Sequence, residues 1–157
     1  MSRYLLIETL ISIAINAAIS AGFAFFVFAG QPEIGLWGPS GLALDFVPQS
    51  FMIALMSVIV PTALTRRRVD AGTLVARADK WPWLPRNLLL RALFAAVGSA
   101  VLLGGAATTL LAAAWTGPLG FPAVLALKIS YGAFVALLVT PPALRAALSD
   151  RTTRERA

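Results

Sequence analysis

The sequence predicts an all-α fold: an integral membrane four-helix bundle made of two tandem transmembrane hairpins. Composition is the first reason, because 59% of the 157 residues are hydrophobic and only 13% are charged. Soluble domains have about half of their residues apolar and about a quarter charged. The other two reasons are four long apolar stretches and a strong concentration of basic residues on one side of them.

Four stretches are long enough to span a membrane, since a helix needs about 20 mainly apolar residues to cross the hydrocarbon core. The predicted spans are residues 4–29, 46–65, 88–115 and 121–146. We expect Asp45 to cap the second span and Pro122 to lie in the first turn of the fourth. The chain then divides into a first hairpin (1–68), a basic cytoplasmic loop with Trp and Pro residues (69–87) and a second hairpin with a short basic tail (88–157).

Basic residues predict the orientation, because Lys and Arg are retained in cytoplasmic loops. Twelve of them fall on one side of the predicted spans and only Lys128 falls elsewhere. The twelve are Arg3, Arg66, Arg67, Arg68, Arg77, Lys80, Arg86, Arg91, Arg145, Arg151, Arg154 and Arg156. We therefore expect a multi-pass protein of the cell membrane, a bacterial inner membrane, with both termini in the cytoplasm.

Several function classes are disfavoured by residues that the sequence lacks. It has no cysteine and no histidine, which removes thiolate nucleophiles, the usual zinc ligands and the commonest acid-base side chain. The basic residues flank apolar spans and form no separate basic domain, so we expect no nucleic acid partner. The sequence predicts a non-enzymatic protein without a cofactor.

The two halves of the chain resemble each other, which predicts an internal duplication. If the duplication is real, both copies have the same orientation and are related by an axis along the membrane normal. Three pairs of segments match: Gly38-Pro39-Ser40-Gly41 with Gly117-Pro118-Leu119-Gly120, Ser50-Phe51 with Ser130-Tyr131, and Pro61-Thr62-Ala63-Leu64 with Pro141-Pro142-Ala143-Leu144.

The second span also resembles a known family. The run Ser50-Phe51-Met52-Ile53-Ala54, continued to Leu64-Thr65-Arg66-Arg67, is similar to the last helix of short two-span bacterial membrane proteins of a domain-of-unknown-function family. A fainter similarity covers residues 130–145. The resemblance implies a duplicated two-span unit and implies no activity.

Polar side chains in the first span follow one helix face. Glu8, Ser12, Asn16 and Ser20 are spaced by four residues, which places them along one side of a helix. They either line a polar path or join helices through hydrogen bonds. Small residues also recur every fourth position, which allows helices to approach closely; they are Ala14, Ala18 and Gly22 in the first span and Ala96, Ala100 and Gly104 in the third.

Two basic residues within the spans are further candidates. Lys128 either extends its ammonium group to the interface, pairs with a residue such as Asp45, or serves an anionic ligand. Aligning the first and third spans places Glu8 opposite Arg91. We expect these two side chains either to form an ion pair between the hairpins or to reach water separately.

The central loop combines clustered arginines with two tryptophans, a pattern typical of the lipid headgroup region. Candidate contacts with the bilayer, and with anionic lipids in particular, are Arg66, Arg67, Arg68, Trp81 and Trp83. The alternative is that these residues only set the orientation.

The sequence favours an accessory or interaction subunit that packs through its helices, as a homo- or hetero-oligomer with other membrane helices. The alternative is a small oligomeric transporter or channel for a small solute. Four helices with few polar groups make a poor pore alone, so transport requires several copies.

The orientation can be tested with reporter fusions. Fusions after Gly72 and after Ala157 are expected to report the cytoplasm and a fusion after Gly41 the opposite side, because of the twelve-to-one distribution of basic residues. Activities of a paired cytoplasmic and periplasmic reporter measure this. A periplasmic signal after Gly72 contradicts the orientation.

Overall fold

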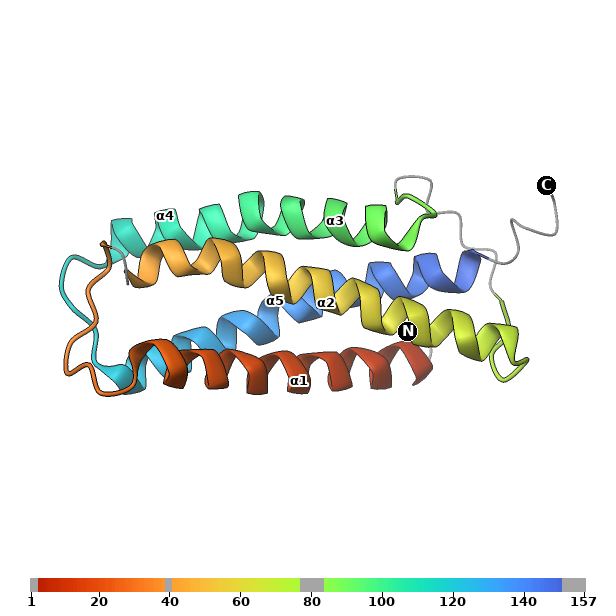
Figure 1. Cartoon of the computed structure of the whole chain (residues 1–157), viewed down its shortest axis with the longest axis horizontal. Coiled ribbons are helices and arrows are strands. Elements are labelled where there is room, and N and C mark those ends of the chain that lie inside the picture. Colours follow the sequence, from red (N-terminus) through yellow and green to blue (C-terminus); the bar gives the residue numbers. More distant parts are fainter. Residues whose placement is uncertain (1–2, 39–40, 77–83, 151–157) are drawn as a thin grey trace.

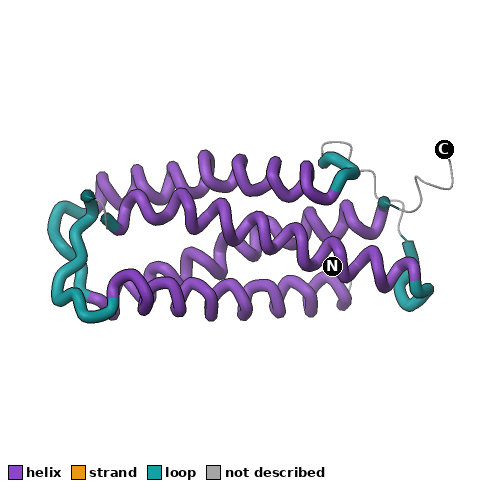
Figure 2. The backbone as a smooth tube through the Cα atoms, viewed as in Figure 1, coloured by secondary structure: helices purple, strands orange, loops and turns teal. Residues whose placement is uncertain are grey.

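The computed structural model describes residues 3–38, 41–76 and 84–150, and these are helical apart from the connections and one isolated β-bridge. The helices are α1 (Arg3–Phe28), α2 (Leu42–Asp70), a third span made of α3 (Leu88–Ser99), η1 (Ala100–Gly104) and α4 (Gly105–Ala114), and α5 (Phe121–Ser149). Four helices of 26 to 29 residues are long and apolar enough to cross a membrane. The predicted all-α four-helix bundle is confirmed (Figures 1 and 2).

The helix ends agree with most of the sequence signals. Pro122 lies in the first turn of α5, as predicted, and the Asn87 side chain caps α3 by accepting hydrogen bonds from the backbone N–H groups of Leu89 and Leu90. The predicted cap at Asp45 is wrong, because α2 begins at Leu42 and Gly41 occupies the cap position. Asp45 instead lies in the first helical turn, where its carboxylate is free to pair with another span.

Packing between the two hairpins is more extensive than packing between the two spans of one hairpin. α2 and α5 pack together, α1 packs mainly on α5, and the third span packs on α2. In Figure 1, α1 and the third span therefore lie on opposite sides, with α2 and α5 between them. Each outer helix rests on the central helix of the other hairpin. A two-fold relation between the hairpins is expected to give this arrangement, and the duplication itself stays a prediction.

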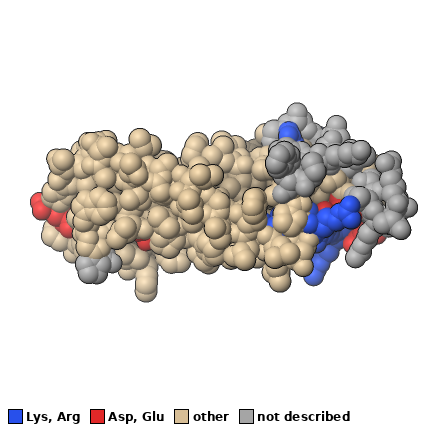
Figure 3. All heavy atoms as spheres, turned by 90° about the horizontal axis from the view of Figure 1, so that it is seen from above, with Lys and Arg blue, Asp and Glu red and all other residues tan. Residues whose placement is uncertain are grey.

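The two ends of the bundle differ in their charge. We call the end where α1 and α3 begin the basic end, and the opposite end the turn end. On the face seen in Figure 3, Lys and Arg side chains gather at the basic end and the long middle of the molecule is almost free of charge. This is the distribution expected for helices that cross an apolar layer.

At the turn end, the two connections between spans are bonded to each other. Ile34 and Leu119 exchange two backbone hydrogen bonds with N–O distances of 2.9 Å each. Beneath them lies a cluster of buried apolar side chains that includes Phe28, Leu36 and Phe46. Gly41 is required in the first connection, because a Cβ there would lie 2.6 Å from the carbonyl oxygen of Leu36. At the turn end, a layer of apolar side chains is therefore covered by two connections whose backbones are hydrogen-bonded to each other.

The small residues of the third span serve close packing, as predicted. Ala96 and Ala100 are buried, and a Cβ on Gly104 would lie 2.8 Å from Cα of Val47 in α2. The approach occurs within η1, a π-helical turn, a local change of helix geometry found mostly as single turns. The corresponding residues of the first span, Ala14, Ala18 and Gly22, are exposed on the outside of α1.

The contact at Gly104 gives a test of the packing. Gly104→Val is expected to lower the Tm in detergent, because overpacking a tight contact costs about 1–3 kcal/mol. Gly105→Val is the matched control, since a Cβ at Gly105 meets nothing within 4 Å. Equal Tm values for the two variants contradict this packing of the third span on α2.

Candidate functional site

The polar face of α1 turns into the bundle. Glu8, Ser12, Asn16 and Ser20 are all buried, and Asn16 is 4% exposed. Their four-residue spacing keeps them on the side of α1 that faces α5 and α2. We call this row and its hydrogen-bond partners the polar spine.

The middle of the polar spine is a network that joins three helices. The Ser12 hydroxyl lies 2.9 Å from the Thr140 hydroxyl of α5 and 3.4 Å from the Ser57 hydroxyl of α2. The Asn16 amide donates to the Ser57 hydroxyl at 3.0 Å and to the Ser12 carbonyl at 2.8 Å. Hydrogen bonds between spans stabilise such bundles by about 0.6 kcal/mol each on average. The network therefore holds α1, α2 and α5 together.

Nearer the turn end, the polar spine continues through Gln49. Its amide donates to the Ser20 hydroxyl at 3.1 Å and to the Lys128 carbonyl at 3.3 Å. Helices α1 and α5 are close at this level, because a Cβ on Gly132 would collide with the Ser20 side chain. The close contact leaves little space along the axis here, which favours packing over a pore.

Lys128 is paired with Asp45. The Lys128 side chain is 2% exposed, its ammonium group donates to the Asp45 carboxylate, and the ammonium lies 5.4 Å from the centroid of the Phe28 ring. Of the alternatives drawn from the sequence, pairing with Asp45 is confirmed. A buried ammonium group requires such a partner, because hydrocarbon cannot solvate it.

Glu8 is paired with Arg68 at the basic end, within the first hairpin. The Arg68 guanidinium donates to the Glu8 carboxylate and lies 5.6 Å from the centroid of the Tyr4 ring. The predicted pair between Glu8 and Arg91 is wrong, because α1 and α3 lie on opposite sides of the central helices. Reaching water separately is also wrong for these residues, since both side chains are buried and bonded within the chain.

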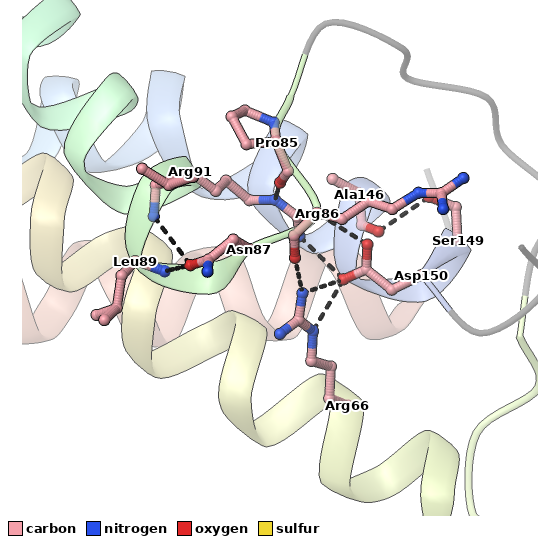
Figure 4. Close-up of polar contacts among 10 residues, drawn as sticks. Arg66, Pro85, Arg86, Asn87, Leu89, Arg91, Ala146, Ser149 and Asp150 are labelled. Atoms are coloured by element: carbon pink, nitrogen blue, oxygen red, sulfur yellow. Dashed lines mark hydrogen bonds and ion pairs between the residues drawn. The ribbon is translucent and has the colours of Figure 1, made fainter. Parts of the chain in front are cut away.

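Arg91 belongs to a second ion-pair cluster, formed with Asp150 and Arg66 (Figure 4). The Arg91 guanidinium, 2% exposed, donates to both carboxylate oxygens of Asp150, at 2.7 and 3.1 Å. Its Nε donates to the Pro85 carbonyl at 2.9 Å. Arg66 reaches the same carboxylate from α2 at 2.6 Å and also donates to the Arg86 carbonyl. Asp150 thus ties α2, α3 and α5 together.

The two hairpins are closed in the same way with opposite signs. In the first, an acid near the start of α1 meets a base near the end of α2. In the second, a base near the start of α3 meets an acid just after α5. Glu8 and Arg91 therefore each have a partner within their own hairpin, which removes the need for the predicted pair between them.

Four partners of these residues did not stand out in the sequence: Gln49, Ser57, Thr140 and Asp150. A signal existed for two of them. Ser50 and Ser57 are seven residues apart, which puts them on one face of α2. Asp150 follows Asp70 by 80 residues, the same offset as Ser130 from Ser50. Asp150 was overlooked because the orientation is predicted from Lys and Arg alone, without the acidic residues near the ends of the spans.

Two of the three proposed lipid contacts among the described residues are engaged within the chain. Arg66 and Arg68 are in the ion pairs above, whereas Arg67 is exposed at the end of α2. Trp81 and Trp83 lie outside the described residues. Among the described residues, Arg67 is therefore the proposed contact that is left for a lipid headgroup, and the proposed contacts of Trp81 and Trp83 stay predictions.

The arrangement defines the class of protein. The chain is an all-helical, multi-pass integral membrane protein whose intramembrane polar groups bond mainly to one another. Among the described residues, no three His, Cys, Asp or Glu side chains gather to hold a metal ion. No protein-family model, curated protein or solved structure matches the chain. The resemblance of residues 50–67 to the two-span family stays a prediction.

Charge reversal tests the pairing. Glu8→Arg and Arg68→Glu are each expected to lower the folded, detergent-stable fraction, because losing a partly buried pair costs about 1–3 kcal/mol, between exposed and buried ion pairs. The double variant should recover it. The control double variant Glu8→Arg/Arg91→Glu should not recover, since Arg91→Glu places a carboxylate beside Asp150. Recovery in the control alone contradicts the assigned partners.

Proposed function

We propose that the chain is a non-enzymatic accessory subunit of a bacterial inner membrane, which binds a transmembrane helix of another protein through the outer face of α1. The observation that carries this proposal is the position of α1. It lies at the edge of the bundle and packs through one face only, mainly on α5. Its opposite face carries Ala14, Ala18 and Gly22, and all three are exposed.

The third span demonstrates what this spacing does. There, Ala96, Ala100 and Gly104 have the same spacing and are buried against α2. Small residues let two helix backbones approach closely in lipid, where apolar side chains gain little by leaving the hydrocarbon. In α1 the corresponding surface has no partner among the described residues, and a Cβ on Gly22 meets nothing within 4 Å.

A non-enzymatic role is supported by how the ionisable groups are used. Glu8, Asp45 and Lys128 are each committed to an ion pair. An acid-base catalyst needs a titratable group that can reach a substrate. The proposed orientation, with both termini in the cytoplasm, follows from the basic end, and exposed Arg67 is suited to anionic lipid at that surface.

A small oligomeric transporter is the second candidate, and the polar spine favours it. Polar side chains extend from the Glu8–Arg68 pair, through Asn16, to the Asp45–Lys128 pair. Transport requires several copies, so self-association through α1 together with solute flux in liposomes distinguishes this candidate from an accessory role.

A single-cysteine crosslink tests the proposal, because the native sequence has no cysteine. A maleimide photo-crosslinker on Ala18→Cys is expected to give one adduct with a different membrane protein, identified by mass spectrometry. Leu102→Cys, 70% exposed in the third span, is the control and should give none. Ala18→Leu and Gly22→Leu should then each abolish co-purification of that protein.

The other outcomes are equally informative. An adduct of two copies of this chain, together with solute flux through the purified protein in liposomes, supports the oligomeric transporter instead. Absence of any protein adduct at Ala18→Cys, or an equal adduct at Leu102→Cys, contradicts binding through the outer face of α1.

A further inference from the structure

Two tryptophan side chains are exposed at the turn end, one in each of the two connections. Trp37 is 60% exposed and Trp115 is 47% exposed. Trp37 closely follows Ile34 and Trp115 closely precedes Leu119, the two residues whose backbones are hydrogen-bonded to each other. Trp115 also comes directly after Ala114, the last residue of α4. Both tryptophans therefore lie in the layer where the apolar spans end.

Both indole rings lack a partner within the protein. Among the described residues, neither indole N–H group has a hydrogen-bond partner and neither ring packs against another ring. A tryptophan side chain is mostly apolar, and its N–H group can only donate. It is best surrounded by apolar groups along the ring and by hydrogen-bond acceptors at the N–H group.

Charged side chains do not attach the turn end to a lipid surface. Among the described residues there, the charged ones are Glu33, Asp45 and Lys128, and the last two form an ion pair. Glu33 is exposed and is repelled by anionic headgroups. The basic end differs, because exposed Arg67 attracts anionic lipid. A lipid contact at the turn end therefore depends on uncharged aromatic groups.

The exposed aromatic side chains at this level occur on both sides of the bundle. Phe26, near the end of α1, is 88% exposed, and Trp115 ends the third span. In Figure 1, α1 and the third span lie on opposite sides of α2 and α5. One partner helix covers one side of a bundle, whereas a lipid leaflet meets all sides. The arrangement favours lipid over a protein partner at the turn end.

We propose that the turn end is a docking surface for the headgroup layer of the leaflet that it faces. The rings of Trp37 and Trp115 lie among the first carbons of the acyl chains, and their N–H groups donate to ester carbonyl or phosphate oxygens of the lipid. Tryptophan is enriched at this level on both faces of membranes. Because the contact uses no charge, it forms with zwitterionic and with anionic lipid. The two connections rest in the headgroup layer and not in water.

Fluorescence quenching tests the proposal by measuring the depth of each ring. The full chain is placed in phosphatidylcholine vesicles with bromine near the ester groups or near the chain ends. Trp37 is observed alone in Trp81→Phe/Trp83→Phe/Trp115→Phe, and Trp115 alone in Trp37→Phe/Trp81→Phe/Trp83→Phe. Bromine near the ester groups is expected to quench both rings more strongly than bromine near the chain ends. Iodide on both sides of the vesicles should quench weakly, and added phosphatidylglycerol should leave the bromine pattern unchanged.

A tryptophan in the middle of a span is the matched control for depth. Leu102 is 70% exposed in the third span. In a chain whose four native tryptophans are replaced by Phe, Leu102→Trp should be quenched most by bromine near the chain ends. The variant Trp81→Phe/Trp83→Phe keeps both rings of the turn end and repeats the measurement with the fewest substitutions.

Four results overturn the proposal. Quenching mainly by iodide places the rings in water, and quenching mainly by bromine near the chain ends places them in the hydrocarbon. Absence of quenching by either agent shows that protein covers them, and a bromine pattern that needs phosphatidylglycerol shows a contact through charge. None of these results bears on the crosslink at Ala18→Cys, so the accessory role and the lipid contact are tested separately.

Discussion

Hydrocarbon offers no hydrogen bonds, and the structure depends on that constraint. Every polar group placed within a span has to find its partner inside the protein or pay several kcal/mol. Ser12, Asn16 and Ser20 satisfy this requirement against α2 and α5, and the buried charges satisfy it through ion pairs. Apolar side chains gain little free energy by exchanging lipid contacts for protein contacts. The hydrogen bonds therefore determine which helices pack against α1. The order of the helices follows from these polar contacts.

The two ends of the bundle are held together by different interactions. At the basic end, Arg68 and Arg91 close the two hairpins through ion pairs with Glu8 and Asp150, so the basic residues gathered there also hold the helices together. At the turn end, few charges are present, and the two connections are hydrogen-bonded to each other and cover an apolar cluster. The Asp45–Lys128 pair lies beside this cluster, with the ammonium group 5.4 Å from the centroid of the Phe28 ring, and links α2 to α5.

Much of this could be predicted from the sequence, because the membrane restricts what a span can be. Length and hydropathy predicted the spans, and the four-residue spacing predicted that one face of α1 is polar. The partners of that face could not be predicted, since spacing within one helix says nothing about which helix lies opposite. The pair of Glu8 with Arg91 failed for this reason: alignment of two repeats shows which residues are equivalent, not which are close. Gln49 was missed because its role lies in hydrogen bonds to Ser20 of α1 and to the Lys128 carbonyl of α5, which only the fold brings together.

The central position of α5 has a consequence for biosynthesis. It is the last of the four spans to leave the ribosome, yet α1 and α2 both pack on it. Until it inserts, the first hairpin can join Glu8 to Arg68 and Asn16 to Ser57, but Asp45 has no cation and Ser12 lacks Thr140. Before that point the Asp45 carboxylate has no counter-charge within the first hairpin. Insertion of α5 therefore completes the buried ion pair and the hydrogen-bond network together, because Lys128 and Thr140 arrive on the same helix.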